Sequence, residues 1–150
     1  VVNNVFYAET PLTNVKLFNG QNATITSVEV ANNTFVNLQS TTSGYFYGTV
    51  SSSIICQNNL IYCTGVTANQ VVFRLKDNDT ANLSGTCSRN VIYKDGTFNW
   101  QLFYGGKMPV ADGEQAEILT VDPFDGGTFE LSTGTFVPNT TYAEYGAKFE

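Results

Sequence analysis

The sequence predicts a single all-β domain, built as an antiparallel β-sandwich with Greek-key-like connections. Strand patterns fill most of the chain, and turn residues separate them at short intervals, as in sandwiches and barrels. The chain has 150 residues, which is the length of one domain. No internal repeat or linker stands out, so residues 1–150 are expected to form one unit.

Alternating side chains mark the clearest strands. Residues 71–76 (VVFRLK) and 97–104 (TFNWQLFY) show the period-two pattern of a strand with one solvated face. β-branched and aromatic residues, which favour half-buried strand positions, dominate further stretches. These predicted strands cover residues 14–18, 24–30, 33–38, 45–56, 59–63, 89–94, 115–121, 128–132 and 140–149.

Turn dipeptides fall between the predicted strands. Asn19-Gly20, Asp95-Gly96 and Gly105-Gly106 all tolerate a positive φ, which tight turns require. Asp95-Gly96 separates two strand patterns directly. A tight β-hairpin is therefore predicted at this position.

Composition excludes several functions. The chain has no histidine, which removes the commonest general base and the usual zinc ligand sets, so neither an enzyme nor a metal site is expected. No cofactor is expected either. The net charge is −6, and the seven basic residues are scattered, which disfavours nucleic-acid binding. No apolar run approaches the roughly 20 residues of a membrane span, so membrane insertion is not expected.

Cysteines and glycosylation sequons point to different compartments. Cys56, Cys63 and Cys87 are odd in number, so at least one thiol is free. Asn-x-Ser/Thr sequons are typical of secreted proteins, and this chain has five of them. A protein that folds in a reducing compartment and acts outside cells fits both observations. The sequons lie at Asn22, Asn32, Asn78, Asn82 and Asn139.

Aromatic and arginine residues suggest where a partner would bind. Residues 45–47 and 103–104 place rings on both faces of their strands, so one ring of each group is expected outside the core. A subunit interface is favoured for these outer rings, with a position under a loop or in a ligand groove as the alternatives. The candidate ligand-binding residues are the two arginines, whose planar fork suits a carboxylate, and two neighbouring polar residues. They are Arg74, Arg89, Thr97 and Asn99.

Two stretches resemble the head domain of adenovirus fibres. Residues 43–55 (SGYFYGTVSSSII) resemble an early Gly-Thr-Val strand that leads into a Ser/Ile-rich strand. Residues 125–131 (DGGTFEL) and 140–150 (TTYAEYGAKFE) are similar to the last hairpin and final strand of that family. The Thr-Leu-Trp-Thr opening of mammalian heads is missing, which indicates a divergent, non-mammalian type.

This resemblance implies an antiparallel sandwich, a homotrimer and attachment to a host-cell receptor. It also implies assembly inside the infected cell and a place on the virion surface. A neutral surface rich in Asn, Thr and Ser favours a glycan over a protein receptor, and a sialylated glycan is predicted. The alternative is a secreted or cell-surface sandwich domain, immunoglobulin-like or lectin-like, with a disulfide that involves Cys87.

Overall fold

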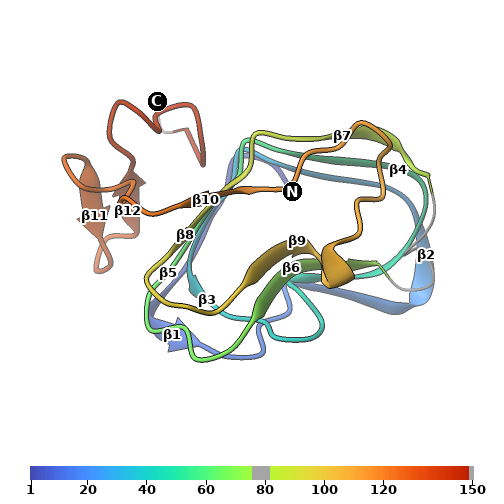
Figure 1. Ribbon diagram of the computed structural model, residues 1–150, viewed down its shortest axis with the longest axis horizontal. Coiled ribbons are helices and arrows are strands. Elements are labelled where there is room, and N and C mark those ends of the chain that lie inside the picture. Colours follow the sequence, from blue (N-terminus) through green and yellow to red (C-terminus); the bar gives the residue numbers. More distant parts are fainter. Residues whose placement is uncertain (76–81, 149–150) are drawn as a thin grey trace.

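The computed structural model describes residues 1–75 and 82–148 and shows a β-solenoid. Viewed down its shortest axis, successive coils of the chain lie over one another (Figure 1). One sheet has the strand order β1-β3-β5-β8-β10, and the second has the order β2-β4-β6-β9, with β7 also paired to β4. The first sheet contains β1 (Val5–Leu12), β3 (Thr34–Leu38), β5 (Leu60–Cys63), β8 (Val91–Lys94) and β10 (Glu117–Leu119).

The second sheet forms the other sides of each coil. The strand β4 is long enough to pair with β6 near its start and with β7 near its end. A short 3-10 turn, η1 (Tyr104–Gly106), follows the last strand of this sheet. The strands are β2 (Phe18–Ala31), β4 (Phe46–Gln57), β6 (Gln70–Leu75), β7 (Ser84–Ser88) and β9 (Trp100–Phe103).

The predicted antiparallel sandwich is therefore wrong. The pairings within both large sheets are parallel, and among the described strands only β11 (Thr128–Glu130) and β12 (Thr135–Val137) pair antiparallel. The predicted Asp95-Gly96 hairpin is also wrong, because β8 and β9 belong to different sheets. Period-two alternation does not distinguish the two arrangements, since strands of both kinds have one inward and one outward face.

The coils repeat a short sequence at each turn. Residues 2–6 (VNNVF), 31–35 (ANNTF), 57–61 (QNNLI) and 88–92 (SRNVI) all lead into a strand of the first sheet. Their last asparagines are Asn4, Asn33, Asn59 and Asn90, which lie 29, 26 and 31 residues apart. The expectation of no internal repeat is thus corrected: the repeat is short and its spacing varies, which hides it.

These four asparagines form a continuous hydrogen-bonded column, called here the asparagine ladder. Asn33 Nδ2 donates to Asn59 Oδ1 at 3.0 Å, and Asn59 Nδ2 donates to Asn90 Oδ1 at 2.8 Å. The backbone N–H groups of Asn4, Asn33 and Asn59 donate to the Oδ1 of the next asparagine in the column, at 3.0, 3.1 and 3.2 Å. The residue before each of them has a positive φ: Asn3, Asn32, Asn58 and Arg89. The ladder thus satisfies buried polar groups at the turn between the sheets.

Side chains of one kind also stack along the solenoid axis. Phe46, Phe73 and Phe103 occupy matching positions of adjacent strands, and each neighbouring pair of rings is stacked with centroids 5.1 Å apart. Phe6 stacks on Phe35 at 5.3 Å in the first sheet. Because every strand contributes to the same column, the core is built from ladders of like residues.

The C-terminal part of the chain covers the outward side of the first sheet. Tyr62 points outward from β5 and contacts Phe124 at a centroid distance of 5.1 Å, and Tyr62 Oη lies 3.0 Å from Asp122 Oδ2. The β11–β12 hairpin lies beside this sheet in Figure 1. Residues 140–148 contain turns and no strand, so the strand predicted at 140–149 is wrong over its described part. This second core contains Val36, Leu60, Tyr62, Val91, Leu119, Phe124 and Phe136.

Candidate functional site

The outer face of the second sheet carries an ordered column of polar and aromatic side chains. Asn19 is in register with Tyr47, and Tyr47 is in register with Arg74. Tyr104 follows Phe103, which is in register with Phe73, and so extends the column by one more coil. We call this set of residues, Asn19, Tyr47, Arg74 and Tyr104, the outer column. It lies next to the inward-facing phenylalanine stack because successive strand residues point to opposite faces.

Arg74 is held in place at the centre of the outer column. Its guanidinium carbon lies 4.4 Å from the centroid of the Tyr104 ring and 5.6 Å from that of Tyr47. Its Nη1 donates to Thr42 O at 2.9 Å. A cation over an aromatic ring is stabilised by about 0.5–1 kcal/mol at an exposed site. Within residues 1–75 and 82–148, two rings and one hydrogen bond therefore restrict the side chain, and its other N–H groups donate to no described residue.

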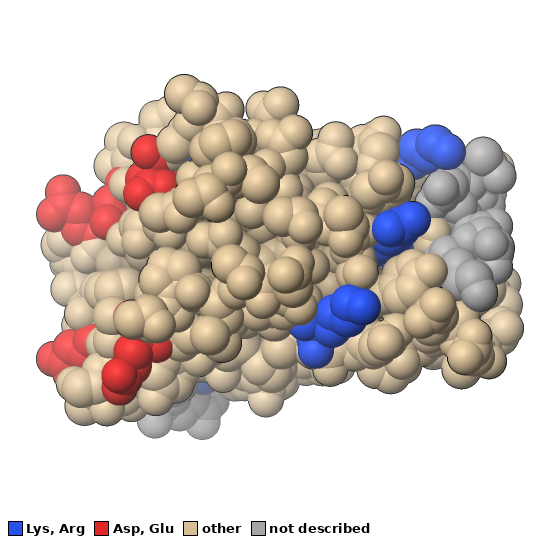
Figure 2. Space-filling view, turned by 90° about the horizontal axis from the view of Figure 1, so that it is seen from below, with Lys and Arg blue, Asp and Glu red and all other residues tan. Residues whose placement is uncertain are grey.

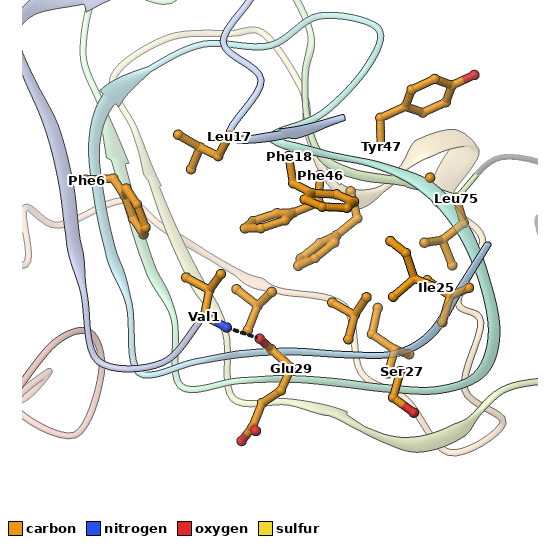
Figure 3. Close-up of a pocket in the computed structure, with 16 residues that line it drawn as sticks. Val1, Phe6, Leu17, Phe18, Ile25, Ser27, Glu29, Phe46, Tyr47 and Leu75 are labelled. Carbon is orange, nitrogen blue, oxygen red and sulfur yellow. Dashed lines mark hydrogen bonds between the residues drawn. The ribbon is translucent and has the colours of Figure 1, made fainter. Parts of the chain in front are cut away.

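Two aromatic rings of the outer column, those of Tyr47 and Tyr104, belong to the groups for which the sequence predicted a ring outside the core. Tyr45 and Phe46 are buried, whereas Tyr47 is only half-buried and points away from the core (Figure 3). Phe103 is buried, and Tyr104 is 39% exposed. The expectation that one ring of each group lies outside the core is confirmed. No interface is present to test the homotrimer, which stays a prediction.

The structure separates the four residues predicted to bind a ligand. Arg89 lies in the turn before β8, and Thr97 and Asn99 lie in the turn after that strand. The Asn99 N–H donates to Asn69 Oδ1 beside the start of β6, whereas Arg74 lies near the end of β6. Arg74 therefore shares its surroundings with Tyr47 and Tyr104 rather than with the other three candidates.

Arg89 has an acidic partner. Its Nη2 forms an ion pair with Glu144 of the C-terminal segment, and its guanidinium carbon lies 6.0 Å from the Tyr145 ring centroid. It also occupies the positive-φ position of the ladder turn that asparagine fills in the other coils. These contacts indicate that Arg89 helps to attach the C-terminal segment.

Charged side chains lie at opposite ends of one face of the molecule (Figure 2). Acidic groups gather at the end formed by β11 and β12, and basic groups gather at the other end. Uncharged side chains cover the surface between them. The low share of charged residues, 13%, thus leaves a broad neutral surface rather than an even mixture of charges.

A separate apolar pocket lies where the first coil leaves the core open. It has a volume of about 330 Å³ and is lined by side chains that include Phe6, Phe18 and Phe46 (Figure 3). Its surroundings contain few polar groups, and Val1 closes one side through a hydrogen bond from its amino group to Glu29 O at 2.7 Å. This pocket is the end of the hydrophobic core and has no arrangement of side chains suited to catalysis.

All three cysteines are free and buried. Cys56 is in register with Cys87 on the adjacent strand. Burial raises the pKa of the Cys63 thiol to about 11 and that of the Cys87 thiol to about 12, so both are protonated at neutral pH. The disulfide involving Cys87, which the hypothesis of a secreted or cell-surface domain predicted, is not formed.

Two further observations concern metal ligands and long apolar helices in the described part of the chain. Residues 1–75 and 82–148 contain no group of three or more His, Cys, Asp or Glu side chains that could hold a metal ion. None of their helices is long and apolar enough to cross a membrane. Of the five sequons, Asn78 lies outside the described residues.

Comparisons with known proteins add no relative. No protein-family model, no curated protein and no solved structure matches this chain. The fold that the fibre-head resemblance implied is not the fold observed. Host attachment, assembly in infected cells and a virion-surface location stay predictions. The function proposed below is argued from the residues of the outer column.

Proposed function

We propose that this chain is a glycan-binding β-solenoid module that recognises carboxylate-bearing sugars, such as sialic acid, along the outer column. The observation that carries the proposal is the placement of Arg74 between Tyr47 and Tyr104. A guanidinium fork binds a carboxylate through two parallel hydrogen bonds, which are stronger than hydrogen bonds between neutral groups. Among the described residues, Arg74 donates one side-chain hydrogen bond, to Thr42 O, and we assign its other N–H groups to the carboxylate.

Neighbouring residues of the outer column supply the other contacts that a sugar needs. Tyr104 is 39% exposed and carries a hydroxyl group, and the Asn19 amide can donate to and accept from sugar hydroxyls. Adjacent strands lie roughly 4.8 Å apart, so the four-coil column extends over about 14 Å. This length suits a short oligosaccharide rather than a single ring.

Preorganisation favours binding at this site. Arg74 has already lost part of its rotamer freedom to the two rings, so less conformational entropy is lost when a ligand binds. Sugar hydroxyls must exchange good contacts with water for contacts with protein, which keeps the affinity of a single site low. We therefore expect millimolar binding, which repeated copies of the module could strengthen through multivalency.

The test is a titration with sialyllactose and with lactose, followed by NMR chemical shifts. Lactose is the control because it lacks the carboxylate. We expect shifts at Tyr47 and Tyr104 with sialyllactose only. Arg74→Gln should abolish them, whereas Arg89→Gln should leave them unchanged, since Arg89 is paired with Glu144.

Two results would contradict the proposal. One is binding that persists in Arg74→Gln and disappears in Arg89→Gln. The other is a lack of response to sialyllactose and to an oligogalacturonate at millimolar concentration, because both ligands carry the required carboxylate. Circular dichroism of each variant checks that the solenoid is intact.

A further inference from the structure

Apolar side chains are exposed where the first coil of the solenoid begins. Val1, Val2, Leu17 and Phe18 are 50%, 44%, 37% and 43% exposed, although Phe18 is in register with the buried Phe46. Of these residues, Val1, Leu17 and Phe18 line the apolar pocket of about 330 Å³ (Figure 3). We call this end of the solenoid, with the free edges of β1 and β2, the N-terminal face. Exposed apolar surface of this kind is typical of a binding surface.

The asparagine ladder has a direction, and its direction shows what the N-terminal face lacks. In Asn33, Asn59 and Asn90, the Oδ1 accepts two hydrogen bonds from the preceding asparagine. Asn33 Oδ1, for example, accepts from Asn4 N at 3.0 Å, and Asn59 Oδ1 accepts from Asn33 N at 3.1 Å. Asn4 Oδ1 is the acceptor at the start of the ladder. Among the described residues no hydrogen bond reaches it.

The opposite end of the ladder is closed. Glu117 is in register with Val91, which places Ala116 beside Asn90 as the next member of the column. Alanine has no side-chain amide, so the ladder ends there, and the main chain continues through a bond from Glu117 N to Asn90 O at 2.8 Å. A polar column that ends in alanine at one end and in an open acceptor at the other is asymmetric.

The backbone of residues 1–3 pairs with the end of β2. Val1 N donates to Glu29 O, Ala31 N donates to Val1 O at 3.1 Å, and Asn3 N donates to Ala31 O at 3.0 Å. This is the hydrogen-bond pattern of parallel pairing, which elsewhere joins complete coils. The edge of β2 beside it, including Ile25 and Val28, lines the open pocket.

We propose that the N-terminal face is a docking surface for one further coil of polypeptide with the same pattern. That coil would pair in parallel with β1 and β2, place an asparagine on Asn4, and fill the pocket with an apolar side chain in register with Phe18. A second copy of this chain stacked head to tail does not meet the requirement. Its last ladder position is Ala116, and its edge strand β10 has only three residues.

An extended chain tests this proposal. Asn3 corresponds to Asn32, so Val1 corresponds to Val30, and a copy of residues 3–29 placed before Val1 adds one coil in register. We expect the denaturant dependence of unfolding to increase by roughly a fifth, because more surface is then buried. Amide exchange at the free edges of β1 and β2 should slow by at least about tenfold.

Two matched controls identify the cause. A scrambled copy of the same composition should leave exchange at β1 and β2 unchanged. A copy with alanine in place of its ladder asparagine should give a smaller protection. If the intact extension leaves both the unfolding and the exchange unchanged, the proposal is wrong.

The unextended chain provides a second test. Light scattering should show no association of two copies through the N-terminal face. Amide exchange at the β1 edge should not depend on protein concentration. Concentration-dependent protection of β1 and β2 would show that a second copy covers the N-terminal face, and would overturn the choice of occupant. Neither result depends on glycan binding at Arg74.

Discussion

Replacing Asn59 with alanine removes the middle of the asparagine ladder. Asn59 is 2% exposed, so water cannot readily replace its partners. Its Oδ1 accepts from Asn33 N at 3.1 Å and from Asn33 Nδ2 at 3.0 Å. Its Nδ2 donates to Val30 O and to Asn90 Oδ1, both at 2.8 Å. These four hydrogen bonds, and a longer one from Asn59 Nδ2 to Cys56 Sγ at 3.7 Å, are therefore lost in one substitution.

The cost follows from which groups are left without a partner. Asn33 N loses the side-chain acceptor that it uses in the native structure, and an unsatisfied buried donor costs about 1–3 kcal/mol. The other lost bonds contribute about 0.5–1.5 kcal/mol each. We therefore expect Asn59→Ala to lower the free energy of unfolding by about 3–6 kcal/mol. For a chain of this size, this corresponds to a fall in Tm on the order of 10 °C.

Denaturant titration followed by tryptophan fluorescence measures this effect, because the single Trp100 is buried and reports unfolding. Asn22→Ala at an exposed position of β2 is the matched control and should change stability by less than about 0.5 kcal/mol. Asn4→Ala should cost less than Asn59→Ala, since Asn4 Oδ1 starts the ladder. A loss below about 1 kcal/mol for Asn59→Ala would refute the role assigned to the ladder.

Two further predictions concern the C-terminal segment and the thiols. Gly146 has a φ of 78°, and a Cβ at this position would lie 2.4 Å from Thr34 Oγ1. Gly146→Ala should therefore release the C-terminal segment and speed amide exchange around Tyr142. Unchanged exchange would argue against this. The raised pKa values of Cys63 and Cys87 mean that the folded state favours the neutral thiols. This contribution to the free energy of unfolding is complete below about pH 8.5 and is lost as pH rises toward 11–12. The free energy of unfolding should be lower at pH 10 than at pH 8 by on the order of 1–2 kcal/mol per thiol. Rapid thiol labelling of the native protein at pH 8 would contradict this account.

The sequence predicted much of the strand content and little of the topology. Predicted strands at residues 24–30, 33–38, 45–56 and 59–63 correspond to observed ones, because β-branched and aromatic residues favour strands of either orientation. What decides between parallel and antiparallel pairing is the partner of each strand. That information was present in the repeated Asn-Asn or Arg-Asn turn, whose spacing of 26 to 31 residues is too irregular for a simple periodicity.

Three strands were missed for local reasons. β1 contains Pro11, and proline within a strand pattern indicates an edge or an end. β7 is built from small polar residues, and its Gly85 has a φ of 117° and lies against Ile54 O. β12 has only three residues. None of these stretches carries the alternation that marks a strand in a sequence.

Part of the candidate site could be predicted. Arg74 was a candidate because it is one of two guanidinium groups, and Tyr47 and Tyr104 were expected outside the core. Their meeting could not be predicted, since they belong to three successive coils, and only the parallel register brings them together. Thr97 and Asn99 were candidates as polar neighbours of the arginines, but they lie in the turn after β8, away from Arg74.

The direction of strand pairing can be tested directly by cysteine cross-linking. Parallel register places Glu29 opposite Ile55 and Ser27 opposite Ser53. An antiparallel pairing that kept Ser27 opposite Ser53 would instead place Glu29 opposite Ser51. Cα atoms on adjacent strands lie about 5 Å apart, within the range that a disulfide spans. The two double variants, Glu29→Cys with Ile55→Cys and Glu29→Cys with Ser51→Cys, therefore distinguish the two arrangements.

Mild oxidation followed by peptide mapping is the most direct measurement of the β-solenoid. The parallel solenoid predicts a disulfide between positions 29 and 55 in high yield, and little or none between positions 29 and 51. The native thiols are buried and should not interfere. Efficient cross-linking of positions 29 and 51, with none between positions 29 and 55, would contradict the parallel fold and with it the outer column around Arg74.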